Sequence, residues 1–328
     1  MRMLIAAATA AIAVLAVALQ FTGVAQAQQA YPTRTVRFIV PYGAASASDI
    51  TARMFADRLS ARWNKPVVVE NRPGGDGLVA LNAFVGAHDD HTLFFGPAGT
   101  FEVLPYDQDT LPFDAKAEIV PIVCVSEVVL AVSVPTSLNV NTLDQLVKLA
   151  QAQPGKLNAA AASGISDFLL FGFIKNTGLQ ITKVPYRDIM QAPNDLAAER
   201  IQLLMTSLAV VQPLAHAGRI KVLAVSSDQR APAAPDVPTA KEAGYPALTF
   251  ESLFGLFGPR GMAENMRESI AADIRQVADA DPAIGKRIGD IGTILSIRRP
   301  SEFAAAIDQQ RMQLAAIAKT LGLKAAQP

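Results

Sequence analysis

Short runs of apolar residues alternate with stretches of helical periodicity along most of the chain. Residues 36–40 form an apolar, β-branched run that is typical of a strand buried on both faces. Small residues follow as far as Asp49, and from Ala52 to Trp63 apolar side chains recur on one helical face. We therefore predict a strand, a loop of small residues and a helix capped by Asp49.

The same succession recurs twice in the next part of the chain. Residues 67–70 and 92–95 are predicted strands, and small residues follow them at 71–77 and 96–100. Loops at the carboxyl ends of parallel strands lie at one edge of the sheet, where ligands bind. Backbone N–H groups at the helix N-termini there suit an anion. We predict that the loops form one anion site, and the alternative is a set of ordinary turns without a ligand.

A second series of strands and helices follows the apolar run at residues 119–134. The apolar run at 248–257 provides a second connection between the two series, so the predicted fold is α/β with two lobes joined by two strands. Lobe 1 is expected to be discontinuous, with residues 28–128 plus 252–328, and lobe 2 to comprise residues 129–251. The strands expected in lobe 2 are 157–162, 181–184, 201–205 and 220–225.

Two helices have recognisable ends. Thr142 and Gln145 form a capping box that opens a helix in lobe 2. The C-terminal stretch is helical in pattern, and its last helix is predicted to be capped at Ser301 and to end at Gly322.

The N-terminus has the layout of a secretory signal peptide at residues 1–27. Arg2 precedes an apolar run at residues 4–19, and Ala25-Gln26-Ala27 supplies a cleavage site, which makes Gln28 the first mature residue. The alternative is a membrane anchor, but the apolar run is shorter than the roughly 20 residues that span a bilayer. We expect export to the periplasm.

Composition narrows the class of protein. The chain has 328 residues, of which 51% are hydrophobic and 18% charged, with a net charge of zero. Such a chain is long enough for two domains and lacks the basic surface that nucleic-acid binding requires. The single cysteine, Cys124, lies in an apolar run and is expected to be a core residue without a disulfide partner.

Catalytic motifs are largely absent from the sequence. His88 and His91 flank Asp89-Asp90 in what we predict to be an exposed polar turn, although a metal pair at this spacing is an alternative. The chain has no Gly-x-Ser-x-Gly elbow, Walker loop or His-Glu-x-x-His helix. Residues 74–77 lack the full spacing of a dinucleotide fingerprint. We expect no cofactor, no metal and no enzymatic activity.

Several motifs in order along residues 31–323 resemble a known family. The chain is similar to the receptors of tripartite tricarboxylate transporters, also called Bug-type periplasmic binding proteins. The motifs that carry this resemblance are Tyr31-Pro32, Ile39-Val40-Pro41-Tyr42, Val69-Glu70-Asn71-Arg72-Pro73-Gly74, residues 96–100, Pro154-Gly155-Lys156-Leu157-Asn158, Val184-Pro185-Tyr186, Pro235-Asp236-Val237-Pro238-Thr239 and Glu242-Ala243-Gly244.

The resemblance implies a type II periplasmic-binding-protein fold, in which two α/β lobes joined by a two-strand hinge close on a ligand cleft like a Venus flytrap. It implies a small organic acid as ligand, delivery to the membrane permease subunits of the transporter, and a monomer. Carried over residue by residue, the ligand-binding positions are Tyr42, Ala45, Ser46, Ser48, Asp49, Gly74, Gly75, Asp76, Gly77, Gly96, Ala98, Gly99, Thr100, Ser163, Ser166, Tyr186, Thr206 and Ser207.

Some positions depart from the family pattern. Residues 43–46 replace a common Pro-Pro-Gly-Gly, Asp76 and Asp188 stand where glycine is common, and Thr206 stands where an acid is common. These departures leave the ligand open. Two other functions remain alternatives, namely a ligand-sensing extracytoplasmic protein and a secreted enzyme on the same scaffold. The enzyme would have to use Asp49, Asp76, Asp167, Tyr186 or Asp188.

The loops also predict how an organic acid would be held. Its carboxylate is expected on backbone amides around Ser46 and Gly99, without an arginine fork. The nearest cations are Arg53, one turn inside the first helix, and Arg187, which is expected on the opposite lobe.

Overall fold

The computed structural model describes residues 31–44, 46–108, 113–162, 164–186 and 189–325. The chain divides into residues 1–33 and a much larger unit from Arg34 onward, and every helix and strand named below lies in the larger unit. The predicted signal peptide lies outside the described residues. No helix in the described ranges is long and apolar enough to cross a membrane.

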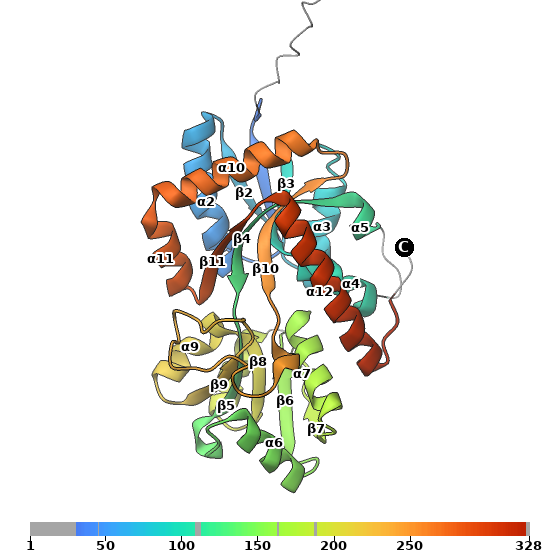
Figure 1. Ribbon diagram of the computed structural model, residues 1–328, viewed down its shortest axis with the longest axis vertical. Helices are drawn as coiled ribbons and strands as arrows, with labels where there is room; N and C mark the ends of the chain where they lie inside the picture. Colours follow the sequence, from blue (N-terminus) through green and yellow to red (C-terminus); the bar gives the residue numbers. More distant parts are fainter. Residues whose placement is uncertain (1–30, 45, 109–112, 163, 187–188, 326–328) are drawn as a thin grey trace, which may run out of the picture. The chain divides into compact units, whose positions relative to one another are not determined.

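The first sheet has six strands in the order β11-β4-β10-β3-β1-β2 (Figure 1). Strand β1 pairs in parallel with β2 and β3, whereas β10 runs antiparallel to β3 and β4. The predicted strands at 36–40, 67–70 and 92–95 are confirmed. The bounds are β1 (Val36–Val40), β2 (Val67–Asn71), β3 (Thr92–Pro97), β4 (Ile119–Val128), β10 (Ser252–Pro259) and β11 (Thr293–Arg298).

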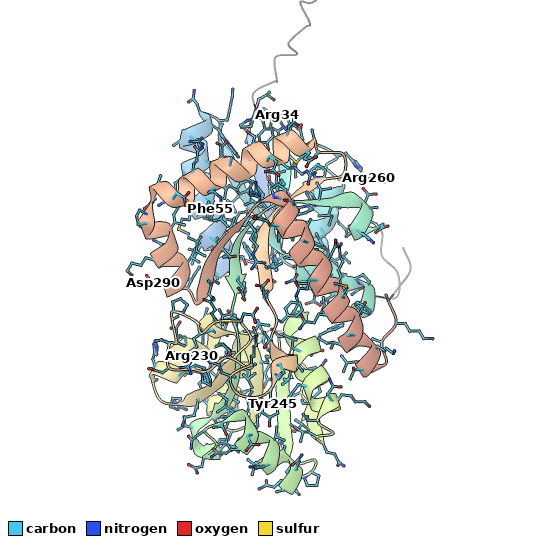
Figure 2. The ribbon with its side chains drawn as sticks, in the orientation of Figure 1. Arg34, Phe55, Arg230, Tyr245, Arg260 and Asp290 are labelled. Atoms are coloured by element: carbon cyan, nitrogen blue, oxygen red, sulfur yellow. The ribbon has the colours of Figure 1, made fainter. Side chains whose placement is uncertain are left out.

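Aromatic side chains fill both faces of this sheet because neighbouring residues of a strand point to opposite sides. Phe94 lies 6.0 Å from Phe257, and its neighbour Phe95 stacks on Phe38 at 5.3 Å between ring centroids. Phe55, labelled in Figure 2, extends the second of these groups from α2. The covering helices are α2 (Ala47–Trp63), α3 (Leu78–Val85), α4 (Gly99–Asp107), α5 (Ala115–Glu118), α10 (Glu264–Ala280), α11 (Pro282–Asp290) and α12 (Pro300–Leu321), with the short helix η1 (Gly75–Gly77).

The second sheet has five strands in the order β7-β6-β8-β5-β9 (Figure 1). Strand β6 is parallel to β7 and β8, and β5 is antiparallel to β8 and β9. The strands are β5 (Leu130–Pro135), β6 (Leu157–Ala161), β7 (Ile181–Lys183), β8 (Leu203–Ser207) and β9 (Ile220–Val225). The helices are α6 (Leu143–Ala152), α7 (Ile165–Asn176), α8 (Ala192–Ala197) and α9 (Leu208–His216), with η2 (Thr136–Leu138), η3 (Ile189–Gln191) and η4 (Pro246–Leu248).

The chain passes between the sheets at two points. The apolar run at 119–134 is two strands, because β4 belongs to the first sheet and β5 to the second, with Val129 between them. The chain returns after η4 and enters β10, which pairs with β4. Helix α12 also reaches the second sheet, since Leu314 and Ala318 belong to its hydrophobic core. The lobe boundaries predicted above stay a prediction.

Several sequence predictions need correction. The C-terminal stretch is not wholly helical, because residues 293–298 form β11 and pair with β4 at the sheet edge. Helix α12 is not capped at Ser301; it begins at Pro300 after the N-cap Arg299, whose amide donates to the Glu302 carboxylate at 3.0 Å. Proline suits this first helical position because its missing N–H would have no partner there.

Other predictions are confirmed. The amide of Gln145 donates to the Thr142 hydroxyl at 3.1 Å, so Thr142 opens α6. Gly322 ends α12 at φ 77°, a conformation that glycine adopts at little cost. Cys124 is fully buried, and burial raises the pKa of its thiol to about 12, so it is a core residue.

Candidate functional site

The loops after β1, β2 and β3 lie against one another, as the sequence predicted. The side chain of Tyr42, in the first loop, hydrogen-bonds that of Thr100, in the third. A Cβ atom on Gly77, in the second loop, would lie only 2.3 Å from Cγ2 of Thr100. Thr100 is therefore the point at which the three loops meet, and a larger residue at 77 would force them apart.

The second loop has an unusual backbone that its sequence explains. Gly74, Gly75, Asp76 and Gly77 all have positive φ, at 125°, 54°, 52° and 96°. Glycine enters this region without a steric penalty, and aspartate tolerates it better than most residues. Asp76 is exposed, and Tyr42 of the first loop is 43% exposed.

The first helix begins earlier than predicted, so Asp49 is not its cap. Helix α2 starts at Ala47, and the Ser46 hydroxyl accepts a hydrogen bond from the Asp49 amide at 3.2 Å. The Asp49 carboxylate is 3% exposed and accepts instead from Arg53 at 3.1 Å and from Asn71 at 2.9 Å. Ser46-x-x-Asp49 is itself a capping pattern, and it could have been recognised in the sequence.

Helix N-termini from both sheets meet at the third loop. Helix α4 begins at Gly99 and helix α7 begins at Ile165, after Gly164 with φ 82°. A Cβ atom on Gly99 would lie 2.6 Å from Cδ1 of Ile165. The first amides of a helix have no partner within that helix, and they carry its positive partial charge. Two such ends close together form an environment that favours an anion.

Gly96 and Ala98 serve the fold rather than an exposed surface. A Cβ atom on Gly96 would lie 2.7 Å from the ring of Phe94, so glycine is required there by packing. Ala98 is fully buried, and its amide donates to the carbonyl of Leu253 at 2.9 Å, which joins the third loop to β10. Backbone contacts therefore fix the start of α4.

The predicted residues of the second lobe have different environments. Ser166 is buried in the first turn of α7, and Thr206 is buried within β8 rather than in a loop. Ser207 ends β8 and is the N-cap residue of α9. The Tyr186 hydroxyl donates to Asp195 at 2.8 Å, and burial together with this carboxylate raises the pKa of Tyr186 to about 12.

Four residues of the predicted or weighed sites lie outside the described residues. They are Ala45, Ser163, Arg187 and Asp188.

The cations near the loops are engaged with carboxylates. Lys183 pairs with Asp167 of α7 at 2.6 Å and lies 4.7 Å from the centre of the Phe171 ring. Asp107, at the end of α4, has its pKa raised to about 6, first by desolvation and then by the charges of Asp167 and Asp76. The charges of three carboxylates, Asp107, Asp167 and Asp76, therefore influence one another on this side of the loops.

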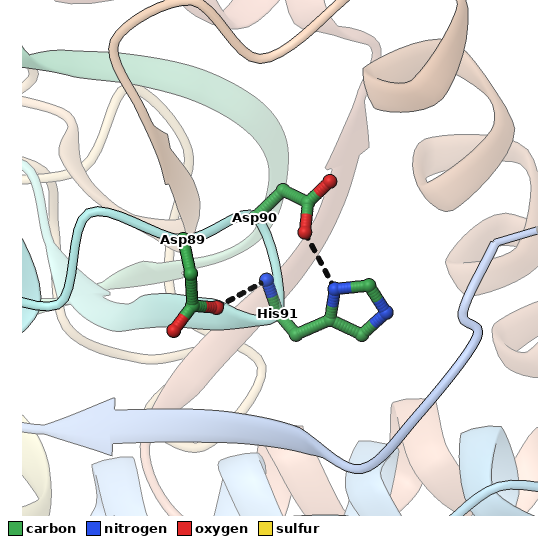
Figure 3. Close-up of side chains that lie close together, drawn as sticks. All are labelled: Asp89, Asp90 and His91. Atoms are coloured by element: carbon green, nitrogen blue, oxygen red, sulfur yellow. Dashed lines mark hydrogen bonds and ion pairs between the residues drawn. The ribbon is translucent and has the colours of Figure 1, made fainter.

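A candidate metal-binding group lies elsewhere (Figure 3). Asp89, Asp90 and His91 bring one ligand atom each within 4.8 Å of one another. These residues precede β3, whereas the three loops follow their strands. The group therefore lies at the amino end of β3, and the loops lie at the carboxyl ends of the strands. The prediction of an exposed turn is wrong for His91, which is 5% exposed. Its ring lies 2.5 Å from the Asp90 carboxylate, and Asp89 accepts from the His91 amide at 2.7 Å.

A groove of about 500 Å³ lies between α9 and the α11–β11 segment. Gln212 lines it from one side, and Gly289 and Ile294 line it from the other. None of the predicted site residues that the structure describes contributes to this lining. The loop site and this groove are therefore separate surfaces that an experiment can distinguish.

Comparison with known proteins gives a consistent family. Residues 51–323 match the model described as the tripartite tricarboxylate transporter family receptor. A UPF0065 protein of Bordetella bronchiseptica is 28% identical over 297 residues, which cover 90% of this chain and 88% of that protein.

Solved structures with similar folds agree with this match. One, described as the structure of a periplasmic transporter, has 28% identity and a TM-score of 0.77, covering 90% of this chain and 99% of its own. R. palustris Rpa4515, solved with adipate, has 27% identity and a TM-score of 0.78, covering 90% of this chain and all of its own (100%). The predicted two-lobed, type II periplasmic-binding-protein fold is confirmed.

Proposed function

Because the chain belongs to the tripartite tricarboxylate transporter receptor family, we propose that it captures a small carboxylate-bearing metabolite between its two lobes and delivers it to a membrane permease. The single observation that supports this most is the meeting of α4 and α7 at Gly99 and Ile165. Each helix contributes unpaired first-turn amides and a positive dipole end, so an anion placed there is stabilised from both lobes.

The loops supply the remaining contacts in this proposal. One carboxylate is held by the amides at the start of α4 and by the first loop, around Ser46 and Gly99. The hydroxyls of Thr100 and Ser166 orient it, since both residues stand in the first turns that meet there. Rpa4515 was solved with adipate, so a relative of similar fold holds a dicarboxylate. We place the second carboxylate of a slim ligand nearer the second loop.

Capture and delivery follow from the two connections between the lobes. The ligand bridges helices that belong to different sheets, and its binding therefore favours the closed arrangement. The closed, ligand-bound monomer is the form that the permease recognises in our proposal. Catalytic use of the same surface would require a nucleophile or an acid–base pair, and the buried Asp49 is already engaged with Arg53 and Asn71.

A thermal-shift screen tests the proposed ligand class. Protein refolded to remove bound ligand is mixed with mono-, di- and tricarboxylates, and with neutral sugars and cationic amines as controls. A ligand at a hundredfold excess over its Kd stabilises the native state by about 2.7 kcal/mol, so melting should rise by several degrees. Mass spectrometry of small molecules released from natively purified protein should then identify the same acid. Shifts with sugars or amines alone would overturn the proposal.

A further inference from the structure

Asn71, at the end of β2, connects three segments around the first loop. Its side-chain Nδ2 donates to the carbonyl of Tyr42 at 2.9 Å and to the carboxylate of Asp49 at 2.9 Å. Its Oδ1 accepts from the guanidinium of Arg53 at 3.0 Å. One amide group thus links β2, the first loop and α2, and both of its polar atoms are used. Asn71 is not among the ligand-binding residues that the sequence predicted.

The bond to Tyr42 fixes the direction of a peptide group. A trans peptide is planar, with its carbonyl and N–H pointing in opposite directions. Because the Tyr42 carbonyl is held by Asn71, the N–H of Gly43 points away from Asn71. Gly43 is exposed, and nothing lies within 4 Å of the place where its Cβ would be, so packing does not prevent this peptide from rotating.

The hydrogen bond from Asn71 to Asp49 helps to satisfy a buried carboxylate. The Asp49 carboxylate is 3% exposed and stands in the first turn of α2, close to the amides proposed to hold an anion. Arg53 and Asn71 supply its donors, at 3.1 Å and 2.9 Å. A carboxylate without these donors would repel a second carboxylate in the loop.

From these contacts, and resting on the proposed function, we propose that Asn71 is a positioning residue for the ligand site. It holds the Tyr42 carbonyl out of the loop, so that an N–H rather than a carbonyl oxygen faces the anion, and it directs the Asp49 carboxylate toward β2. If Asn71 is removed, the Tyr42–Gly43 peptide samples the flipped orientation, in which a carbonyl oxygen opposes the ligand.

The sequence offers a reporter for this single peptide. Tyr42-Gly43 is the only Tyr-Gly pair in the chain, so protein labelled with 13C at the tyrosine carbonyl and 15N in glycine gives one HNCO peak. We expect one sharp peak in the wild-type protein. Asn71→Ala should shift or broaden it, whereas Val68→Thr, on the exposed side of the same strand, should leave it unchanged.

Binding of adipate and succinate is measured on the same variants. We expect Asn71→Ala to raise the Kd about tenfold, the order expected for one lost hydrogen bond. It should also lower the melting temperature of the unliganded protein, because the buried Asp49 carboxylate loses one donor. Asn71→Asp keeps the shape but places a second carboxylate beside Asp49, and it should weaken binding more than Asn71→Ala. Asn71→Ser serves as the replacement if alanine prevents folding.

The outcomes separate the two proposals. An unchanged peak in both Asn71→Ala and Asn71→Asp would overturn the positioning role. So would an unchanged Kd in these variants when the wild-type protein binds the acids. If the wild-type protein binds neither adipate nor succinate nor any other carboxylate of the screen, the proposed function fails, while the HNCO peak still decides whether Asn71 orients the peptide.

Discussion

Two buried polar regions of the first lobe are built in opposite ways. Near the loops, the Asp49 carboxylate finds donors in Arg53 and Asn71, and every polar atom of the Asn71 side chain is used. Where the chain passes between the sheets, Glu127 is also buried, at 7% exposure. Its Oε1 atom has no hydrogen-bond partner among the described residues.

Glu127 is not the only such group at the crossing. Thr249, Ser252 and Gln310 also bury an oxygen without a partner in the described part of the chain. The Glu251 carboxylate accepts hydrogen bonds from both terminal nitrogens of Arg298 at 2.9 Å. Burial raises the pKa of Glu127, and the charge of Glu251 raises it further, to about 7. A fully paired network has one favoured arrangement, whereas unpaired groups can change partners or take up water as strands bend.

This difference predicts that the first loop is the more rigid of the two regions. The polar contacts of Asp49 and Asn71 around that loop are saturated. Those at the two connections on which closure depends are not. Variants in each region test the difference, and those with the largest expected effect come first.

Breaking the paired network should cost the most stability. Arg53→Met removes the cation from the buried Asp49 carboxylate, and we expect a loss of about 3 kcal/mol because the charge stays buried without its main partner. Arg72→Met is the matched control. Both arginines are about half exposed, but the side chain of Glu70, the partner of Arg72, is 24% exposed against 4% for that of Asp49, so Arg72 should contribute less than about 1 kcal/mol. Urea unfolding measures both. Equal losses would contradict a rigid, saturated network.

At the crossing, the predicted effect depends on pH. The folded-state pKa of Glu127, about 7, lies above the ordinary value of 4.5, so the folded protein keeps a proton that the unfolded chain releases. Its contribution therefore becomes less favourable as pH rises from 4.5 to 7 and stays unfavourable above that. Glu127→Gln should raise stability by about 2 kcal/mol at pH 8 and change little at pH 4.

The control for this prediction is Glu199→Gln, at an exposed carboxylate of the second lobe. Melting curves of both variants between pH 4 and pH 8 give the answer. The proposed role of burial at the crossing is wrong if Glu127→Gln and Glu199→Gln show the same pH dependence as the parent.

Gly99, in the third loop, lies against Ile165 of the second lobe. Gly99→Ala places a Cβ 2.6 Å from Cδ1 of Ile165, and we expect a stability loss of about 1–2 kcal/mol because the end of that side chain can move only partly. Carboxylate binding should weaken as α4 and α7 are held apart. Gly289→Ala is the control: its Cβ meets no atom within 4 Å, and it lines the other groove. If Gly289→Ala weakens carboxylate binding and Gly99→Ala leaves it unchanged, the ligand binds in that groove and not at the loops.

The smallest expected effect is at the cap of α2. Ser46→Ala removes the acceptor of the Asp49 amide, and it should cost about 1 kcal/mol. Ser48→Ala, at the second residue of α2, should cost less stability, because the side chain that accepts the capping hydrogen bond is that of Ser46. Thermal unfolding compares the two, and a larger loss for Ser48→Ala would mean that Ser48 contributes more than the cap.

Much of the fold could be predicted because the information is local. The apolar runs at 36–40 and 220–225 have the bounds of β1 and β9, since a strand buried on both faces leaves a continuous apolar stretch. Thr142 and Gly322 delimit helices because caps act over a few residues. The loops of small residues, and the expectation that they gather at one sheet edge, came from the same succession of strand, loop and helix.

The misassigned elements depended on distant partners. Residues 293–298 form the strand β11 because they pair with the backbone of β4, which is distant in the sequence. His91 is buried although polar residues precede it, since it stands where β3 enters the sheet.

For the candidate site, local sequence shows which loops carry glycine and small hydroxyl residues, and hence that backbone amides would be accessible there. The directions of those amides depend on contacts that form only in the folded protein. Asn71 reaches a carbonyl 29 residues earlier in the chain, and Gly99 meets Ile165 of the other lobe. Hydrogen bonds and packing between such distant residues depend on where the strands place them, and no local pattern encodes that.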